Sequence, residues 1–491
     1  MELAAELEAS LRELASAASV EVRENGGRLA PLASLCWEVR GAAEKPLLHL
    51  WSSEHNVTRR VLAITDQSEH RLTLAVERFG RNKPDRLEFV KMNFDRSARD
   101  LTRQAFCEHL RRILAEHFPD ETVESLLVSA DLEHSLSGNY VRGILRRGAA
   151  RWAVLAVADR ESSDTVENSL TFALLWLERA RQSARPTIVG LRLILPDGGA
   201  RIVAQRMAAL HPQLLLELYE RDPVCETLRR LEPQAAGNIH SWIVPQHETQ
   251  SLLERARKML DPVIALAPCG ISLHPSAPSA EIWLRFRGLA FARWREDRVC
   301  FGIGEPRKEL SAACWPELKE LLNDLDVRRH PLAINTRHPL YRAQPERWLE
   351  AIIREDVTRV DTLLDARFVY SQVFANAGGE HGILDLLAVT RGGRLAILEL
   401  KAAEHIHLPL QAAGYWRHVC HHLANKELSR CGYFPGLSLQ SAPPLIYLVA
   451  PALHFHPATG ELLRYLSPEV EVVRVGLAQS WRRGLRVVMR Q

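Results

Sequence analysis

The chain lacks the paired cysteines of a zinc ribbon and the cysteine density of a disulfide-stabilised protein. Its eight cysteines are scattered over 491 residues without a CxxC motif, which indicates reduced thiols. No stretch approaches the roughly 18 consecutive apolar residues of a membrane span. The first residues, MELAAELEASLRELASA, carry several glutamates and lack the apolar core of a signal peptide. We therefore expect a cytoplasmic protein that begins with an amphipathic helix.

Nucleotide-binding loops and long charge blocks are also absent. Neither a P-loop nor a GxGxxG in strand–helix context is present, which excludes a nucleotide-driven motor. Lys+Arg 63 against Asp+Glu 60 gives a net charge of +3, which excludes a strongly basic nucleic-acid coat protein. Local basic stretches can still bind nucleic acid, because the whole-chain sum hides them.

The pattern of apolar residues predicts a multidomain α/β protein with four regions. One hydrophobic core rarely exceeds roughly 250–300 residues, so at least two domains are expected. Residues 1–98 read as a helix followed by a β-rich region, and residues 99–235 as alternating strands and helices around a mainly parallel sheet. A connector with a helix and a β-hairpin follows at 236–336. Residues 337–491 form the last α/β unit.

Residues 382–416 carry the strongest chemical signal. Their sequence, GILDLLAVTRGGRLAILELKAAEHIHLPLQAAGYW, predicts two apolar strands joined by a Gly-Gly turn at 392–393. Asp385 lies near the start of the first strand, and Glu399 and Lys401 share one face of the second. Ionisable groups in a buried hairpin are costly unless they pair or hold a metal. Two carboxylates suit Mg²⁺, and a lysine beside them can orient an attacking water. An edge-strand ion pair between Glu399 and Lys401 is the structural alternative.

The order of these residues resembles the PD-(D/E)xK nuclease superfamily, whose fold is that of many restriction endonucleases. Asp385 is followed after 13 residues by Glu399, Leu400 and Lys401. Leu384 stands where the name-giving proline of the family would be, a position that varies in the superfamily. The resemblance covers about 135 residues and implies a restriction-endonuclease-like mixed sheet flanked by helices.

Two helices extend the resemblance. The helix at LPLQAAGYW, with Gln411 and Tyr415, looks like the QxxxY helix of exonuclease-type members. The family also places an acidic residue on the helix before the hairpin, and PERWLEAIIREDVTRVD offers Glu346, Glu350 and Glu355. Of these we choose Glu350.

The resemblance implies hydrolysis of phosphodiester bonds assisted by Mg²⁺ or Mn²⁺, in DNA more than in RNA. It assigns Asp385, Glu399 and the main-chain carbonyl of Leu400 as metal ligands. Lys401 would position the nucleophilic water. Glu350 would complete a second metal or its water shell, and Gln411 would support Lys401 and the substrate phosphate. The rival is a nucleic-acid-binding or scaffolding subunit of a defence or repair complex, with a vestigial nuclease site. Protein partners or a homodimer are compatible with both.

The middle region resembles the last region as an internal repeat that lacks the candidate site residues. RWAVLAVA (151–158) matches RLAILELK (394–401). This match places Ala156 at Glu399, Ala158 at Lys401, Thr171 at Gln411, Glu108 at Glu350, and Arg142 near Asp385. The alternative is that any two α/β units with this order of elements resemble each other. If the repeat is real, the middle unit is a nuclease-like domain without its acidic residues.

Candidate nucleic-acid contacts come from two basic stretches and one aromatic residue. They are Arg142, Arg146, Arg147 and Arg151 in the middle unit, Arg81 and Lys83 within residues 78–112, and Tyr415. Lys and Arg side chains beside Gly and Pro could bind phosphates. The alternative is that these charged side chains are solvated in loops. His418 and His422 are four apart on one helix face, a metal-binding spacing, but no partner pair is evident and a solvated or DNA-facing helix is favoured.

Overall fold

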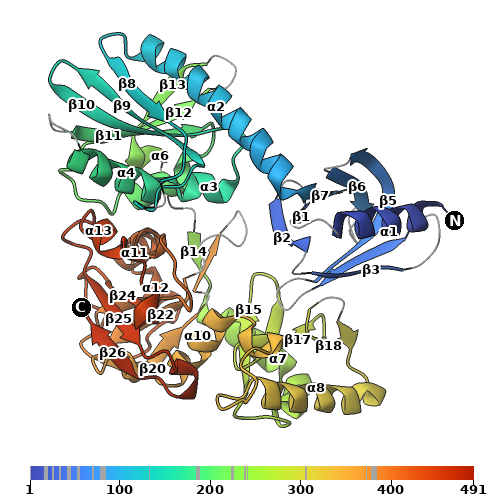
Figure 1. Cartoon of the computed structure of the whole chain (residues 1–491). Coiled ribbons are helices and arrows are strands. Elements are labelled where there is room, and N and C mark those ends of the chain that lie inside the picture. The colour runs from blue at the N-terminus through green and yellow to red at the C-terminus, as the bar shows by residue number, and fades with distance from the viewer. Residues whose placement is uncertain are drawn as a thin grey trace. The chain divides into compact units, whose positions relative to one another are not determined.

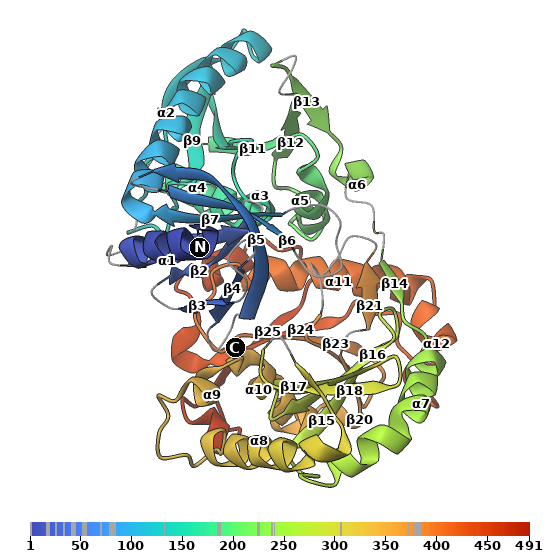
Figure 2. The ribbon, with the colours of Figure 1, turned by 90° about the vertical axis from the view of Figure 1, so that its right-hand side faces the viewer.

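The computed structural model divides the chain into two compact units, each assembled from separate stretches of sequence (Figures 1 and 2). The first comprises Met1–Thr102, Ala256–His274 and Glu281–Gln344, and the second Arg103–Arg255, Pro275–Ala280 and Pro345–Gln491. The described residues are 2–15, 20–24, 27–32, 35–40, 46–51, 56–68, 71–77, 85–131, 133–183, 188–222, 226–236, 239, 241–304, 307–371, 373–376 and 384–491. The prediction of a mixed α/β chain with several sheets is confirmed. The N-terminal region and most of the predicted connector lie in the first unit, and most of the middle and last regions lie in the second.

The N-terminal part of the first unit is a helix with a seven-stranded antiparallel sheet, which agrees with the predicted helix and β-rich region. Helix α1 (Glu2–Ala15) contributes Leu7 and Leu11, four residues apart and fully buried, to the core of this sheet. The strand order is β2-β1-β7-β6-β5-β4-β3. The strands are β1 (Val20–Glu24), β2 (Gly27–Pro31), β3 (Cys36–Arg40), β4 (Leu47–Trp51), β5 (Asn56–Ser68), β6 (Arg71–Glu77) and β7 (Asp85–Lys91).

The connector contributes a second sheet to the first unit. Its strand order is β15-β16-β17-β18-β19, and the sequence had predicted only a hairpin there. Helix α7 crosses from the second unit into the first, and α8 begins with Pro316 in its first turn. The elements are α7 (Gln246–Ile264), β15 (Ile271–Ser276), β16 (Glu281–Phe286), β17 (Leu289–Arg295), β18 (Arg298–Phe301), β19 (Lys308–Glu309), α8 (Trp315–Arg328) and α9 (Pro339–Arg342).

The middle repeat, residues 103–236, is built on a six-stranded sheet. Strand β10 is a near-continuous apolar run, as is typical of a strand buried on both faces, and its residues 153–157 are all at most 1% exposed. The sheet is mixed rather than mainly parallel, because β8 and β13 add antiparallel edges. The elements are α2 (Met92–His117), β8 (Thr122–Leu127), β9 (Tyr140–Arg147), β10 (Ala150–Val157), α3 (Ser163–Glu167), α4 (Ser169–Ser183), β11 (Ile188–Pro196), α5 (Ala200–Met207), β12 (Leu216–Arg221), β13 (Leu228–Leu231) and α6 (Pro233–Ala236).

The C-terminal repeat, residues 345–491, carries a second six-stranded sheet. All six residues of its strand β23 are buried, so the two ionisable side chains at the end of this strand enter an apolar setting. The elements are α10 (Pro345–Glu355), β20 (Leu364–Tyr370), β21 (Phe374–Asn376), β22 (Leu386–Thr390), β23 (Leu395–Leu400), α11 (Leu408–Ala424), α12 (Glu427–Arg430), β24 (Leu445–Pro451), α13 (Thr459–Leu463), β25 (Val472–Leu477) and β26 (Val487–Arg490). Strand β21 pairs with β14 (Ser241–Ile243).

The two sheets have the same strand order and the same strand directions. The orders are β8-β9-β10-β11-β12-β13 and β20-β22-β23-β24-β25-β26. In each sheet the third and fourth of the five pairings are parallel, and the first, second and fifth are antiparallel. Helices α4 and α11 each follow the third strand, and α5 and α13 each follow the fourth. The internal repeat is therefore confirmed at the level of strand order and connectivity.

Strand pairing shifts the residue match between the repeats by one position. Leu400 pairs with the residue two positions before Pro451, at the end of β24. Ala156 pairs with the residue two positions before Pro196, at the end of β11. Ala156 therefore corresponds to Leu400, and the predicted match of Ala156 to Glu399 is wrong. A slip of one residue turns every strand side chain to the other face, so the difference changes which residues line the site.

The corrected register shows what fills the site of the middle repeat. Arg142 pairs with Leu155 across β9 and β10, and the pairing of Leu386 with Leu398 sets Asp385 opposite Glu399. The equivalent positions are Arg142 for Asp385, Leu155 for Glu399 and Val157 for Lys401. The middle repeat thus lacks all three groups, as predicted, with other residues in their places.

The hairpin that carries the C-terminal residues turns at Gly393. Its φ is +89°, and its amide donates to the carbonyl of Thr390 over 2.9 Å. A Cβ at this position would lie 2.2 Å from the carbonyl oxygen of Ser438. Both the backbone conformation and the lack of space therefore require glycine.

Replacing Gly393 by alanine is expected to lower the free energy of unfolding by about 2–3 kcal/mol, through backbone strain and the contact with Ser438. Thermal unfolding of purified protein measures the change. Gly460→Ala is the matched control, because a Cβ there meets nothing within 4 Å. Equal melting temperatures for the two variants would contradict the assignment.

Candidate active site

Asp385 and Glu399 face each other where the start of strand β22 lies beside the end of strand β23. Asp385 directly precedes β22, and its Oδ2 accepts a hydrogen bond of 3.0 Å from the amide of Leu400. This bond ties the carboxylate to the end of β23, between Glu399 and Lys401. The sequence prediction that the hairpin brings these residues together is confirmed.

Glu399 and Lys401 form a buried ion pair. The Nζ of Lys401 donates to Oε1 of Glu399 over 3.1 Å, and the two residues are 8% and 1% exposed, respectively. The second oxygen of Glu399, Oε2, is buried and has no hydrogen-bond partner among the described residues. A buried carboxylate oxygen without a partner is unfavourable by itself, so this atom is suited to a ligand.

Helix α10 adds charged residues beside Asp385. Arg347 donates from Nη1 to Oε2 of Glu350 over 2.7 Å, and the same nitrogen lies 3.8 Å from Oδ1 of Asp385. Glu350 is 2% exposed, so the chosen acidic residue does reach the site, held by an arginine that the sequence argument had not considered. Glu346 lies one helical turn before Glu350 and raises the pKa values of Glu399 and Lys401. Its spacing of four residues from Glu350 was the signal that both share a helix face.

Burial dominates the electrostatics of the site. It raises the pKa of Asp385 to about 6, against the opposing influence of Lys401 and the Leu400 amide. Burial together with the charge of Asp385 raises the pKa of Glu399 to about 8. Burial alone would lower the pKa of Lys401, but the carboxylates Glu399, Glu346 and Asp385 outweigh it and raise it. Without a cation, the pair of facing carboxyl groups therefore tends to retain one proton between them at neutral pH.

The donors fit a hard divalent cation. Among the described residues, no cluster of three or more His, Cys, Asp or Glu is arranged for a metal, so a closed structural site is not formed there. Mg²⁺, however, is commonly bound by one or two carboxylates and completes its shell with water and substrate phosphate. Asp385 and the Oε2 of Glu399 supply oxygen donors of this kind.

Helix α11 contributes Gln411 and Tyr415 to the same region. Gln411 donates from Nε2 to the hydroxyl of Tyr415 over 3.2 Å, so among the described residues its side-chain partner is Tyr415 rather than the predicted Lys401. Burial raises the pKa of Tyr415, and the charges of Glu399 and Asp385 raise it further. Tyr415 is only 9% exposed. It is placed to support the site more than to offer an open surface to nucleic acid.

Arg206, from the middle repeat, was not predicted. Its guanidinium donates to the carbonyl of Glu167 and to Asn168, and its side chain lies against Gly414 of α11. Burial lowers the pKa of Arg206, while Tyr415 and Glu399 are among the groups that raise it. The positive charge of Arg206, nearly 200 positions earlier in the chain, thus interacts with the site. No local sequence pattern could show this interaction.

Two histidines after β23 complete the surroundings. Burial lowers the pKa of His405 to about 4 and that of His407 to about 3, and in each case neighbouring cations contribute. His407 Nδ1 lies 2.9 Å from the hydroxyl of Thr171 in the middle repeat. Both rings are therefore neutral at physiological pH and add no positive charge for a phosphate.

The arginines predicted as nucleic-acid contacts are mostly engaged within the protein. Arg142 is 3% exposed, donates to the carbonyl of Ser129 and lies over the ring of Trp176. A phosphate cannot reach it directly, and its predicted place on a surface is wrong. Arg146 and Arg147 are exposed and pair with Glu124 and Asp120, while Arg151 also pairs with Glu124. Arg81 and Lys83 lie outside the described residues.

His418 and His422 join helix α11 to its neighbours. Both rings lie 2.9 Å from the hydroxyl of Ser241 in β14. His418 also contacts Gln205 of α5, and His422 pairs with Glu427 over 2.5 Å. Their spacing therefore serves a hydrogen-bond network.

Comparison with protein-family models and with curated proteins finds no match to this chain. The described part of the chain contains no helix that is long and apolar enough to cross a membrane. The function is therefore inferred from the geometry of the site.

Proposed function

We propose that the protein is a metal-dependent nuclease that hydrolyses phosphodiester bonds, in DNA, at the site formed by Asp385, Glu399 and Lys401. The observation that carries the proposal is the buried Oε2 of Glu399, which lacks a partner among the described residues while Asp385 faces it from the next strand. The resemblance to PD-(D/E)xK nucleases and a restriction-endonuclease-like fold agrees with this function. The shared strand order of the two repeats is compatible with that fold.

Asp385 and Glu399 would hold Mg²⁺ or Mn²⁺, with the carbonyl of Leu400 as a further donor. Such an ion would supply Lewis-acid stabilisation of the negative charge that develops on the phosphate. Glu350, held by Arg347, places a further carboxyl group beside the donors. A metal at this place would also relieve the repulsion between the two carboxylates that raises the pKa of Glu399.

Lys401 acts on the attacking water and on the phosphate. Its ammonium group stays charged, because the surrounding carboxylates raise its pKa. From its position beside Glu399, it orients the water and offsets charge on the phosphorane. The oxygen of this water forms a bond to phosphorus and gives up one proton to solvent. The P–O bond to one deoxyribose oxygen breaks, and that oxygen leaves with the electron pair and takes up a proton.

Purified protein is expected to cut plasmid, single-stranded or branched DNA with Mg²⁺ or Mn²⁺, and a chelator should abolish the cleavage. Asp385→Asn should abolish cleavage while it leaves DNA binding and folding intact, because the amide oxygen can still accept the Leu400 hydrogen bond. Gel electrophoresis of the products and circular dichroism measure these outcomes.

Glu320→Gln is the matched control, because Glu320 is an exposed carboxylate on α8. It should cut DNA at the wild-type rate. A wild-type protein that binds DNA and cuts nothing that Asp385→Asn spares would favour the rival function, a nucleic-acid-binding subunit with a vestigial site.

A further inference from the structure

The contact between the two repeats has local two-fold symmetry. Leu210 of the middle repeat and Leu466 of the C-terminal repeat form an isolated antiparallel bridge. Reciprocal hydrogen bonds flank it: His211 N to Tyr465 O at 2.8 Å, and Ser467 N to Ala209 O at 2.9 Å. Each C-terminal residue lies 256 positions after its counterpart. The contact is therefore made by equivalent segments of the two repeats.

The helices around this bridge follow the same symmetry. Helix α5 packs on α11, and its counterpart α13 packs on α4, the counterpart of α11. His418 of α11 reaches Gln205 at the end of α5. Glu178, which lies 240 positions before His418 on α4, accepts a hydrogen bond of 2.8 Å from the hydroxyl of Tyr465, just after α13. The equivalent positions His418 and Glu178 thus each contact the other repeat.

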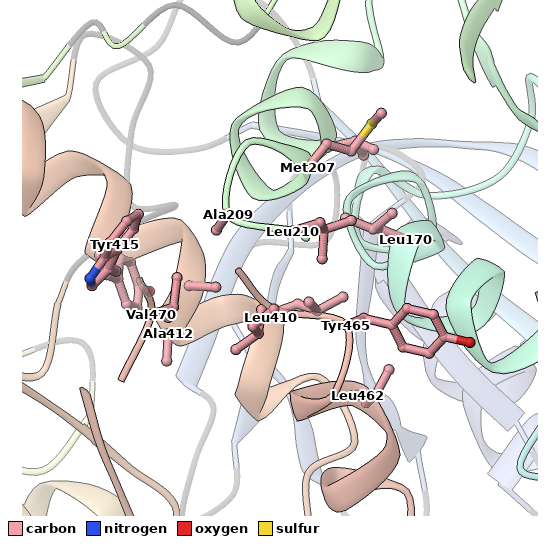
Figure 3. Packing of buried hydrophobic residues seen from close by; sticks show 14 of the residues in the cluster. Leu170, Met207, Ala209, Leu210, Leu410, Ala412, Tyr415, Leu462, Tyr465 and Val470 are labelled. Carbon is pink, nitrogen blue, oxygen red and sulfur yellow. The ribbon is translucent and has the colours of Figure 1, made fainter. Parts of the chain in front are cut away.

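Apolar side chains from both repeats fill the contact and belong to one continuous core. Figure 3 shows Leu170 and Leu210 of the middle repeat on one side, with Leu410 and Leu462 of the C-terminal repeat on the other. All four are at most 7% exposed. We call this contact, made by α4, α5, α11, α13 and the Leu210–Leu466 bridge, the repeat interface.

An interface of this kind is isologous, as in a two-fold symmetric homodimer. Here the middle repeat occupies the place that a second C-terminal repeat would take. The face formed by α11 and α13 is therefore covered within the chain and cannot pair with the same face of another molecule. The arrangement is a dimer of two nuclease-like units fused into one chain.

Only one half of this internal dimer carries the chemistry. In the middle repeat a buried arginine, a leucine and a valine stand at the three site positions. Arg142 donates to a main-chain carbonyl, so a cation already occupies the place where a metal-binding carboxylate would be. This fixed positive charge disfavours a divalent cation, and none of the three site positions offers a carboxylate as a ligand.

We infer that the protein makes a single-strand break at each binding event: it is a nicking enzyme in which the middle repeat replaces the second catalytic subunit. This inference rests on the proposed nuclease function. A symmetric dimer of active subunits can cut both strands, one at each site. The internal dimer offers one site, so one water is added across one P–O bond and the opposite strand stays intact. The middle repeat instead supports that site, through Arg206 and Thr171.

The test uses the full-length protein with Mg²⁺ on two substrates. One is a supercoiled plasmid, and the other is a linear duplex whose strands carry different labels. The expected product from the plasmid is open-circular DNA, and linear DNA should appear only after nearly all the supercoiled form has been nicked. In the duplex, the two labels should be cut in separate events, and the initial rate should be proportional to the protein concentration.

Linear plasmid that forms together with open circles from the first time point would overturn the inference, but leave the nuclease function standing. A rate that rises with the square of the protein concentration would overturn it too, because two chains would then be needed for one cut. The absence of cleavage on every substrate would overturn the proposed nuclease function, and the nicking inference with it.

Discussion

Lys401→Met is expected to reduce the rate of DNA cleavage by about 10²–10³-fold, without loss of metal binding. Lys401 donates a hydrogen bond to Glu399, one of the two facing carboxyl groups. Its removal takes away the charge that orients the water. It also removes a positive charge next to the metal donors, so the affinity for Mn²⁺ should rise. Single-turnover cleavage and the Mn²⁺-induced shift in melting temperature measure the two effects separately.

Lys319→Met is the control for this variant, since Lys319 is an exposed lysine on α8. It should cleave and bind Mn²⁺ as the wild type does. If Lys401→Met cleaves at the wild-type rate, the lysine has no role in the reaction. If it loses both cleavage and the Mn²⁺-induced shift, its role is structural.

The second large effect is the dependence of metal binding on pH. The folded protein has raised pKa values for Asp385, about 6, and for Glu399, about 8. The metal-free folded state therefore binds protons more tightly than the unfolded chain, and its stability falls as the pH rises from the ordinary carboxyl range toward about 8. A divalent cation needs both groups ionised, so its affinity and the cleavage rate should rise over the interval from about 6 to about 8.

The metal-induced rise in melting temperature should therefore be larger at a pH above about 8 than at a pH near 6. Differential scanning fluorimetry with and without Mn²⁺, at matched ionic strength, measures it. Asp385→Asn should show no such rise at either pH. A wild-type shift that is the same at both values would contradict metal binding by these two carboxylates.

The local part of the site was predictable because it is encoded within one hairpin. The Gly-Gly turn and the alternation of strand faces place Asp385, Glu399 and Lys401 together, and the structure agrees. The helix residue Glu350 was found by its order in the chain. Its partner Arg347 was missed, because an arginine next to a candidate glutamate is indistinguishable in sequence from a solvated helix charge.

The errors come from interactions that sequence spacing does not encode. The match between repeats slipped by one residue, since loops of different length between equivalent strands hide the register. Arg142 sits in a basic stretch that reads as surface, yet packing against Trp176 buries it. Arg206 enters the site only because two segments nearly 200 residues apart in sequence fold against each other.

The repeat interface also has a consequence for the order in which the protein folds during synthesis. Leu210 is made 256 residues before Leu466, which at about 5–20 residues per second is a delay of roughly 10–50 seconds. Until α11 and then α13 have been made, the apolar face of α4 and α5 has no partner from the C-terminal repeat. The nascent middle repeat is thus exposed to aggregation or to pairing with another nascent chain.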